Sequence, residues 1–216
     1  DRSIKPSLPF YDGTSFAVNG DMIIVTLNYR LGPLGFMDLS SYGMTESANL
    51  GLQDQIAALN WVRSNIEAFG GDPERITVFG ESAGAMSVAA LLAMPAANGL
   101  FRGAIMQSGA SQVLPPSTAR GVTEAMIGLL GGQPGDPSVL MEASSEQLLQ
   151  AAGRLHESSE VGLLTLPFQP VLHAQTLPVE PLRAIRDGAA KGVALVIGTN
   201  QDEGRMFINR SEHMMN

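Results

Sequence analysis

Residues 80–84 read Gly-Glu-Ser-Ala-Gly, and this G-x-S-x-G sequence constrains the fold more than any other feature of the chain. The apolar run at residues 76–79 predicts a strand before it, and the small-residue run at 85–94 predicts a helix after it. A strand that turns so sharply into a helix crosses it closely, and glycines on both sides of Ser82 remove side chains that would collide. The pattern therefore predicts a nucleophile elbow with the serine hydroxyl pushed outwards.

The position of Ser82 at the start of a predicted helix favours nucleophilic chemistry. The first N–H groups of a helix are free, and the helix dipole is positive at that end, which suits a developing oxyanion. Ser82 is accordingly the candidate nucleophile, and the Ala83 N–H is the candidate oxyanion donor. The alternative is an ordinary glycine-rich turn with a buried serine.

Composition excludes several classes of function. The chain has 216 residues, of which 44% are hydrophobic, so it can bury a sizeable core. Its net charge of −8 gives no electrostatic basis for nucleic-acid binding, and no apolar run approaches the length of a membrane span. The absence of cysteine excludes disulfides, thiolate chemistry and cysteine-ligated metals, and nothing in the sequence indicates a metal or a cofactor.

Apolar runs and helical patterns alternate along the chain, which is typical of an α/β domain with a mostly parallel sheet. The apolar run at residues 22–27 has the composition of a strand buried on both faces. We expect strands at residues 22–27, 76–79, 103–107 and 193–198, and helices at 52–69, 85–94, 117–131 and 145–156. The helix-rich region at about 115–190 is interpreted as a possible insertion over the sheet.

Several longer motifs resemble one family. They occur in a fixed order at residues 28–36, 49–55, 69–73, 79–85, 107–109 and 198–204. In this order they closely resemble the type-B carboxylesterases, the cholinesterase-like branch of the α/β-hydrolases, with bacterial para-nitrobenzyl esterases as the nearest group. The resemblance covers essentially all of residues 1–216. It implies an α/β-hydrolase fold in which helices flank a mostly parallel central sheet that is incomplete at both ends.

The resemblance also implies a Ser-Glu-His triad and an acyl-enzyme intermediate. Ser82 matches the nucleophile of the family, and Glu203 matches its acid. From the residues alone, Asp202 and Glu203 remain equally open choices, and either could be a solvated loop carboxylate. The serine-then-acid order is that of the α/β-hydrolases.

Four further residues fall in matched motifs. Glu81 either adds negative potential beside the nucleophile or is a buried carboxylate bound to backbone or water. Ser108 matches a family serine near the triad, and the alternative is a plain strand-end hydroxyl. Arg30 and Asp54 are expected to form a structural ion pair, whose disruption would leave a buried charge without a partner.

Other expected parts of the family's site are missing. The His-Gly-Gly-Gly-Phe-like loop that supplies further oxyanion N–H groups would precede residue 1, and the family histidine would follow the last residue. His156, His173 and His213 all lack the family's histidine context. We therefore expect a partial domain, an internal piece of a larger esterase, with two of the three triad members and surfaces that its missing parts would cover.

The leading hypothesis is that the parent protein is a serine carboxylesterase acting on uncharged esters of small to medium acids. This chain by itself is expected to be inactive. The alternative is a non-catalytic cholinesterase-like binding module or an inactive fragment; a lipase or amidase on the same fold is a third possibility. The family and the lack of cysteine favour the bacterial cytoplasm, with secretion as the alternative because the start of the chain looks incomplete. The sequence does not indicate an oligomeric state.

Overall fold

The described strands form one three-stranded parallel sheet. The computed structural model describes residues 11–109, 111–158 and 166–205. The strands are β1 (Thr77–Glu81), β2 (Gly103–Gln107) and β3 (Ala194–Gly198), in the order β1-β2-β3. Both pairs are parallel, and the last residues of the three strands align in register. The mostly parallel sheet predicted from the sequence is confirmed.

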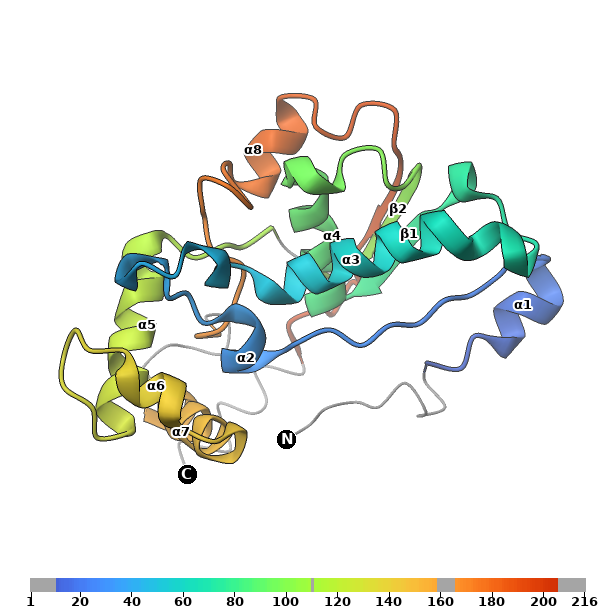
Figure 1. Ribbon diagram of the computed structural model, residues 1–216. Coiled ribbons are helices and arrows are strands. Elements are labelled where there is room, and N and C mark those ends of the chain that lie inside the picture. Colours follow the sequence, from blue (N-terminus) through green and yellow to red (C-terminus); the bar gives the residue numbers. More distant parts are fainter. Residues whose placement is uncertain (1–10, 110, 159–165, 206–216) are drawn as a thin grey trace.

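Helix α4 (Ala83–Ala93) covers one face of this sheet and packs on β1 and β2 (Figure 1). Its sequence consists mainly of alanine, leucine and valine, and nearly all of it from Ala85 onwards is buried. Small side chains allow a helix to approach a sheet closely while still burying apolar area. Helices α3 (Leu50–Asn65) and α8 (Pro181–Arg186) pack on α4 in turn.

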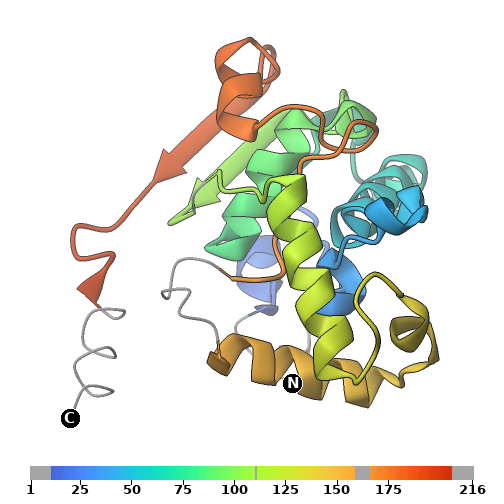
Figure 2. The same ribbon diagram turned by 90° about the vertical axis from the view of Figure 1, so that its left-hand side faces the viewer.

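A second group of helices lies beside this layer. It contains α5 (Pro116–Leu129), α6 (Ser138–Glu142) and α7 (Ser145–Ser158). Their main contacts are with one another and with α2 (Gly32–Phe36). Figure 2 shows α7 crossing α5 near one end of that helix. A separate apolar core forms there, consisting of Met37, Leu39, Met126, Ile127, Leu140, Leu148 and Ala151.

The remaining elements are short. Helix α1 (Thr14–Gly20) contains no buried residue, and its Phe16 ring lies 6.3 Å from the Phe79 ring of β1, centroid to centroid. Five 3₁₀ turns complete the described elements: Ser40–Tyr42, Thr45–Ser47, Ile66–Phe69, Pro73–Arg75 and Pro95–Ala97. No helix among the described residues is both long enough and apolar enough to cross a membrane.

The expected buried strand at residues 22–27 is absent. This segment is extended and runs past α3 (Figure 1), but it joins no ladder, and Met22, Ile23, Val25 and Leu27 are exposed. An apolar β-branched sequence forms a buried strand only where a neighbour pairs with its backbone. Among the described residues the segment has no such neighbour, because β1, at the edge of the sheet, pairs only with β2.

The amphipathic helix expected at residues 52–69 forms, with one difference at its end. Leu52, Ile56 and Ile66 are buried as predicted, but Phe69 is 63% exposed and lies beside Trp61, with ring centroids 6.3 Å apart. The chain tightens into the 3₁₀ turn Ile66–Phe69 at this point. A turn of three residues instead of 3.6 rotates Phe69 off the buried face.

Candidate active site

The candidate site lies where the three parallel strands end. Ser82 follows β1, Ser108 follows β2, and residues 199–203 follow β3. The Ser82 N–H donates to Gln107 O at 2.9 Å, and the Ser108 N–H donates to Gly198 O at 2.8 Å. These bonds extend the two ladders one residue beyond the ends of β1 and β2. The carboxyl edge of a parallel sheet is the usual location of ligand sites in α/β folds, so the candidate residues are gathered at a suitable edge.

Ser82 occupies a strained turn between β1 and α4. Its backbone has φ 54° and ψ −116°, a conformation that L-residues other than glycine rarely adopt. Such strain costs about 1–3 kcal/mol and persists only where the surroundings hold it. Two backbone hydrogen bonds hold Ser82 in this conformation. Its N–H donates to Gln107 O, and its C=O accepts from the Met86 N–H at 3.0 Å. Ser82 is exposed, so the alternative of a buried serine is wrong.

The two glycines of the motif do not have equal roles. A Cβ atom at Gly80 would lie 2.4 Å from the carbonyl carbon of Gly84, which leaves no room for a side chain. A Cβ atom at Gly84 would meet no described atom within 4 Å. Gly80 is therefore the glycine that permits the close crossing, and the expected collision at Gly84 is absent from the described part of the chain.

Gly109 is a third close approach that the sequence reasoning did not single out. A Cβ atom there would lie 2.3 Å from Ala85 Cβ and 2.9 Å from Ser82 O. The chain after β2 therefore lies directly against the first turn of α4. The only signal in the sequence was the position of this glycine immediately after Ser108.

Glu203 is bound to the end of the neighbouring strand. Its Oε2 accepts hydrogen bonds from the Asn200 N–H at 2.6 Å and from the Ser108 hydroxyl at 3.0 Å. These donors lower the pKa of Glu203, the Asn200 backbone bond most strongly. Asp202, by contrast, lies 3.9 Å from Arg205 of its own loop. The geometry therefore distinguishes two carboxylates between which residue types alone could not choose.

The other predicted residues near the nucleophile lie at the surface. Ala83 is exposed at the first position of α4, and among the described residues no carbonyl accepts a backbone bond from its N–H. Glu81 ends β1 and is also exposed, so its reading as a buried carboxylate is wrong.

Comparison with known proteins agrees with this geometry. Residues 3–215 match the Carboxylesterase family. The chain belongs to this family. It is 54% identical over 201 residues to the para-nitrobenzyl esterase of Bacillus subtilis, and 41% identical over 203 residues to the phenmedipham hydrolase of Pseudarthrobacter oxydans. These alignments cover 93% and 92% of the chain but only 41% and 39% of the relatives, so the chain spans about two fifths of their length.

Solved carboxylesterase structures share the fold. A thermophilic PNB esterase, 53% identical in sequence, superposes with a TM-score of 0.89 over 93% of this chain and 42% of its own. A carboxylesterase of Geobacillus stearothermophilus, 43% identical, gives a TM-score of 0.86 over 97% of this chain and 45% of its own. The α/β-hydrolase fold predicted from the sequence is confirmed.

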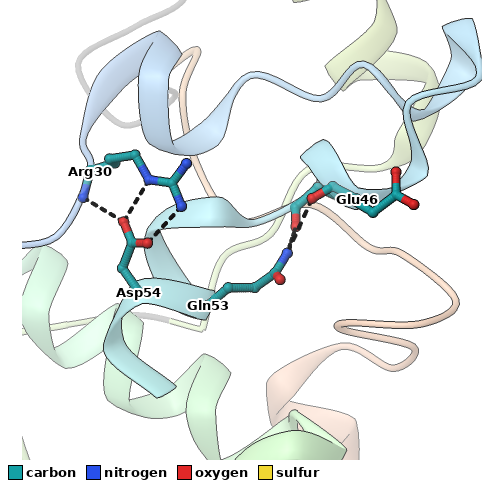
Figure 3. A network of polar contacts seen from close by, with 5 residues as sticks. Arg30, Glu46, Gln53 and Asp54 are labelled. Carbon is teal, nitrogen blue, oxygen red and sulfur yellow. Dashed lines mark hydrogen bonds and ion pairs between the residues drawn. The ribbon is translucent and has the colours of Figure 1, made fainter. Parts of the chain in front are cut away.

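Arg30 and Asp54 of this carboxylesterase chain form a bidentate pair (Figure 3). Arg30 donates to Asp54 from Nη2 at 2.6 Å, from Nε at 2.8 Å and from its backbone N–H at 3.0 Å. The side-chain bonds raise the pKa of Arg30 and lower that of Asp54. The side chains are 47% and 26% exposed, so the expectation of a buried pair is wrong in this structure. The segment before α2 is nonetheless tied to α3.

Asn49 is a structural residue that sequence reasoning missed. It precedes α3 in the left-handed conformation and is fully buried. Its Nδ2 donates to Val171 O at 2.8 Å and to Thr176 Oγ1 at 2.9 Å, while its Oδ1 accepts from the Val171 N–H at 2.8 Å. The amide thus replaces a strand neighbour for Val171. The signals in the sequence were its place directly before a helix and at the start of the matched motif 49–55.

The histidines do not supply an evident base. His156 is exposed on α7, and His173 Nδ1 lies 3.4 Å from Thr176 Oγ1 within its own loop. His213 lies outside the described residues. The structure therefore gives no reason to assign the base to His156 or His173.

An open hollow of about 380 Å³ lies near the chain that follows β2. A pocket for the scissile ester must reach the nucleophile, and neither Ser82 nor Glu203 lines this hollow. We therefore do not assign it to the substrate. Its lining residues are Ser111, Gln112, Val113, Leu114, Pro115, Thr118, Gln169 and Glu180.

Proposed function

We propose that the protein carrying this chain is a serine carboxylesterase that hydrolyses carboxylic esters through an acyl-enzyme intermediate. One observation carries the proposal: a strained, exposed Ser82 and a carboxylate bonded to the adjacent strand end lie at the same edge of the sheet. Family membership supports it, and para-nitrobenzyl esterase and phenmedipham hydrolase are the names of two relatives.

The reaction proceeds in two acyl transfers. A histidine from another part of the protein takes the proton of the Ser82 hydroxyl as its oxygen attacks the ester carbonyl. The Ala83 N–H donates to the oxygen of the tetrahedral intermediate. The intermediate collapses, the alcohol leaves with the proton from the histidine, and water then attacks the acyl-enzyme by the same route.

Glu203 orients the histidine and stabilises its charged form. The hydrogen bonds from Asn200 and Ser108 lower its pKa, so the carboxylate is ionised at neutral pH. An ionised acid beside the imidazole favours the imidazolium that forms during proton transfer. Glu81 adds negative potential nearby, and the Arg30–Asp54 pair has an architectural role.

The substrate class and the cellular location are also part of the proposal. We assign uncharged esters of small to medium acids as substrates, an assignment that family membership supports. We assign the bacterial cytoplasm, which the bacterial relatives and the lack of cysteine support, with secretion as the alternative.

The test is hydrolysis of a short-chain 4-nitrophenyl ester by the full-length protein and by its Ser82→Ala variant. We expect the substitution to lower kcat by at least about a thousandfold, because triad members act as a unit. Ser64→Ala, at an exposed serine of α3, is the control and keeps the full rate. Equal rates for Ser82→Ala and the unchanged protein would contradict the proposal and favour a binding module.

The 216-residue chain by itself provides a second measurement. No histidine among the described residues has been assigned as the base for Ser82, so we expect no Ser82-dependent hydrolysis by this chain alone. A Ser82-dependent rate in this chain would show that one of its own histidines completes the site.

A further inference from the structure

The two oxygens of the Glu203 carboxylate have different surroundings. Oε2 accepts both hydrogen bonds, from the Asn200 N–H at 2.6 Å and from the Ser108 hydroxyl at 3.0 Å. Within residues 11–109, 111–158 and 166–205, no hydrogen bond reaches Oε1. An ionised carboxylate has acceptor capacity on both oxygens, so Oε1 is the one available to a further donor.

The side chain of Asn200 determines which way the Ser108 hydroxyl donates. Asn200 Nδ2 lies 3.4 Å from Ser108 Oγ and can only donate to it. A hydroxyl has a single hydrogen, and Ser108 directs this hydrogen to Glu203 while a lone pair faces the amide. Asn200 therefore acts on Glu203 directly, through its backbone and more weakly through its side chain, and indirectly through Ser108.

We infer that Asn200 is a positioning residue of this site: its amide holds the Ser108 hydroxyl as a donor to Glu203 Oε2, which leaves Oε1 to receive the N–H of the base histidine. The inference rests on the proposed role of Glu203. It assigns a function to a residue outside the triad and states which carboxylate oxygen takes part in the catalytic hydrogen bond.

The backbone around Ser108 supports this assignment. Ser108 has φ 51°, the left-handed region that is unfavourable for a residue with a side chain, and its N–H is bonded to Gly198 O. This fixed backbone places the hydroxyl between Asn200 and Glu203. A plain strand-end hydroxyl would need no such strain.

Charged neighbours do not account for the properties of Glu203. In the described part of the chain, hydrogen bonds from Asn200 and Ser108 are what lower its pKa, and no charged group contributes. On its own loop, Arg205 is paired with Asp202. At the same edge of the sheet, the exposed Glu81 carries a like charge. Neutral donors from Asn200 and Ser108 therefore keep Glu203 ionised.

The decisive variant is Asn200→Asp in the full-length protein. The new side chain has the same shape but accepts where the amide donates, so the Ser108 hydrogen turns away from Glu203 and a second negative charge approaches it. We expect kcat for a 4-nitrophenyl ester to fall about 10- to 100-fold with KM changed less than about threefold. Gln201→Glu is the matched control, since it adds the same charge on the adjacent residue, and it keeps kcat within about twofold.

A second measurement is independent of catalysis. The pKa of Glu203 is followed by carbon-13 NMR of side-chain-labelled glutamate, with the signal assigned through Glu203→Gln. We expect Asn200→Asp to raise this pKa by about one unit, and Gln201→Glu to raise it by less than about 0.3. If Ser82→Ala proves harmless, this titration alone decides the inference, and the proposed esterase function fails separately.

A double-mutant cycle tests the route through Ser108. Asn200→Ala retains its backbone N–H, and we expect it to lower kcat in the unchanged background but to add less than about twofold to Ser108→Ala. Full additivity of the two substitutions would overturn the inference. So would an Asn200→Asp variant whose kcat and Glu203 pKa match those of Gln201→Glu.

Discussion

Two serines with positive φ terminate neighbouring strands. Ser82 and Ser108 have φ 54° and 51°, and each follows a strand in the same register. An L-residue in such a conformation costs about 1–3 kcal/mol, so two of them at neighbouring strand ends considerably destabilise this edge of the sheet. Ladder bonds to Gln107 and Gly198 hold both serines in place. At this scale, strain and the candidate chemistry coincide.

The Arg30–Asp54 pair gives a prediction at the same scale. Because Arg30 lowers the pKa of Asp54 in the folded chain, the pair stabilises the fold above the unfolded pKa of about 4. That contribution is lost as the pH falls through the lower, folded pKa. Asp54→Asn should reduce the free energy of unfolding by about 1 kcal/mol at pH 7, a value kept small by the exposure of Arg30.

Urea unfolding at pH 7 and at pH 2.5 checks this prediction, since the difference between the two proteins should shrink at the lower pH. Asp187→Asn is the control, because Arg183 and Asp187 form an exposed pair 3.7 Å apart that should contribute almost nothing. A difference that persisted unchanged in acid would mean that Asp54 acts through packing rather than charge.

The elements show what a sequence pattern can and cannot predict. The strand expected at residues 103–107 has these bounds in the structure, where β1 and β3 pair with it on both sides. Residues 22–27 are richer in β-branched side chains but form no strand, since pairing depends on a neighbour that local sequence does not specify. Phe69 differs for a subtler reason, a change from 3.6 to 3.0 residues per turn.

The candidate site divides in a similar way. Ser82 could be predicted because the elbow is a local motif whose glycine and helix lie within a few residues. Choosing Glu203 over Asp202 required a family resemblance. The hydrogen bond that distinguishes Glu203 comes from the backbone of Asn200, and no pattern of residue types predicts such a bond. Asn49 and Gly109 were missed because their partners are distant in sequence, at Val171 and at Ser82.

The unequal roles of Gly80 and Gly84 give a prediction at the scale of the β1–α4 unit. Gly80→Ala places a Cβ atom 2.4 Å from backbone, which cannot rotate away, so we expect a loss of about 3 kcal/mol or failure to fold. Gly84→Ala places its Cβ in open space at the second position of a helix, and we expect its stability to change by less than about 1 kcal/mol.

Thermal unfolding of the two variants side by side is the measurement. Because both substitutions add one methyl group to the same turn, differences in hydrophobicity cancel. Equal destabilisation would show that the crossing depends on both glycines, as the sequence pattern alone suggested.

At the scale of the whole molecule, the described residues form two larger apolar cores and a small third cluster of Leu114, Ala119 and Val171. One larger core surrounds α4, the other surrounds α5 and α7, and the half-buried Phe168 packs against both. Asn49 contributes another connection, since it binds the chain 122 residues further on. The relative placement of the segments around these cores therefore depends on particular buried groups as well as on apolar area.

Asn49→Ala tests this dependence. The substitution leaves the Val171 N–H and C=O without their partners in a buried place, and it puts alanine in a left-handed conformation. We expect a loss of about 2–4 kcal/mol in the free energy of unfolding. Asn60→Ala, which removes an exposed amide bonded to Ile56 O within one turn of helix, should cost less than about 0.5 kcal/mol.

The long separation between Asn49 and Val171 has a kinetic consequence. Contacts between residues 122 positions apart can form only after a long stretch of chain has been ordered, whereas the β1–α4 crossing closes over a few residues. The amide of Asn49 should therefore engage Val171 late in folding, after the rate-limiting step. Its removal would accelerate unfolding and leave the folding rate nearly unchanged, so this asparagine determines how long the native state lasts rather than how quickly it is reached.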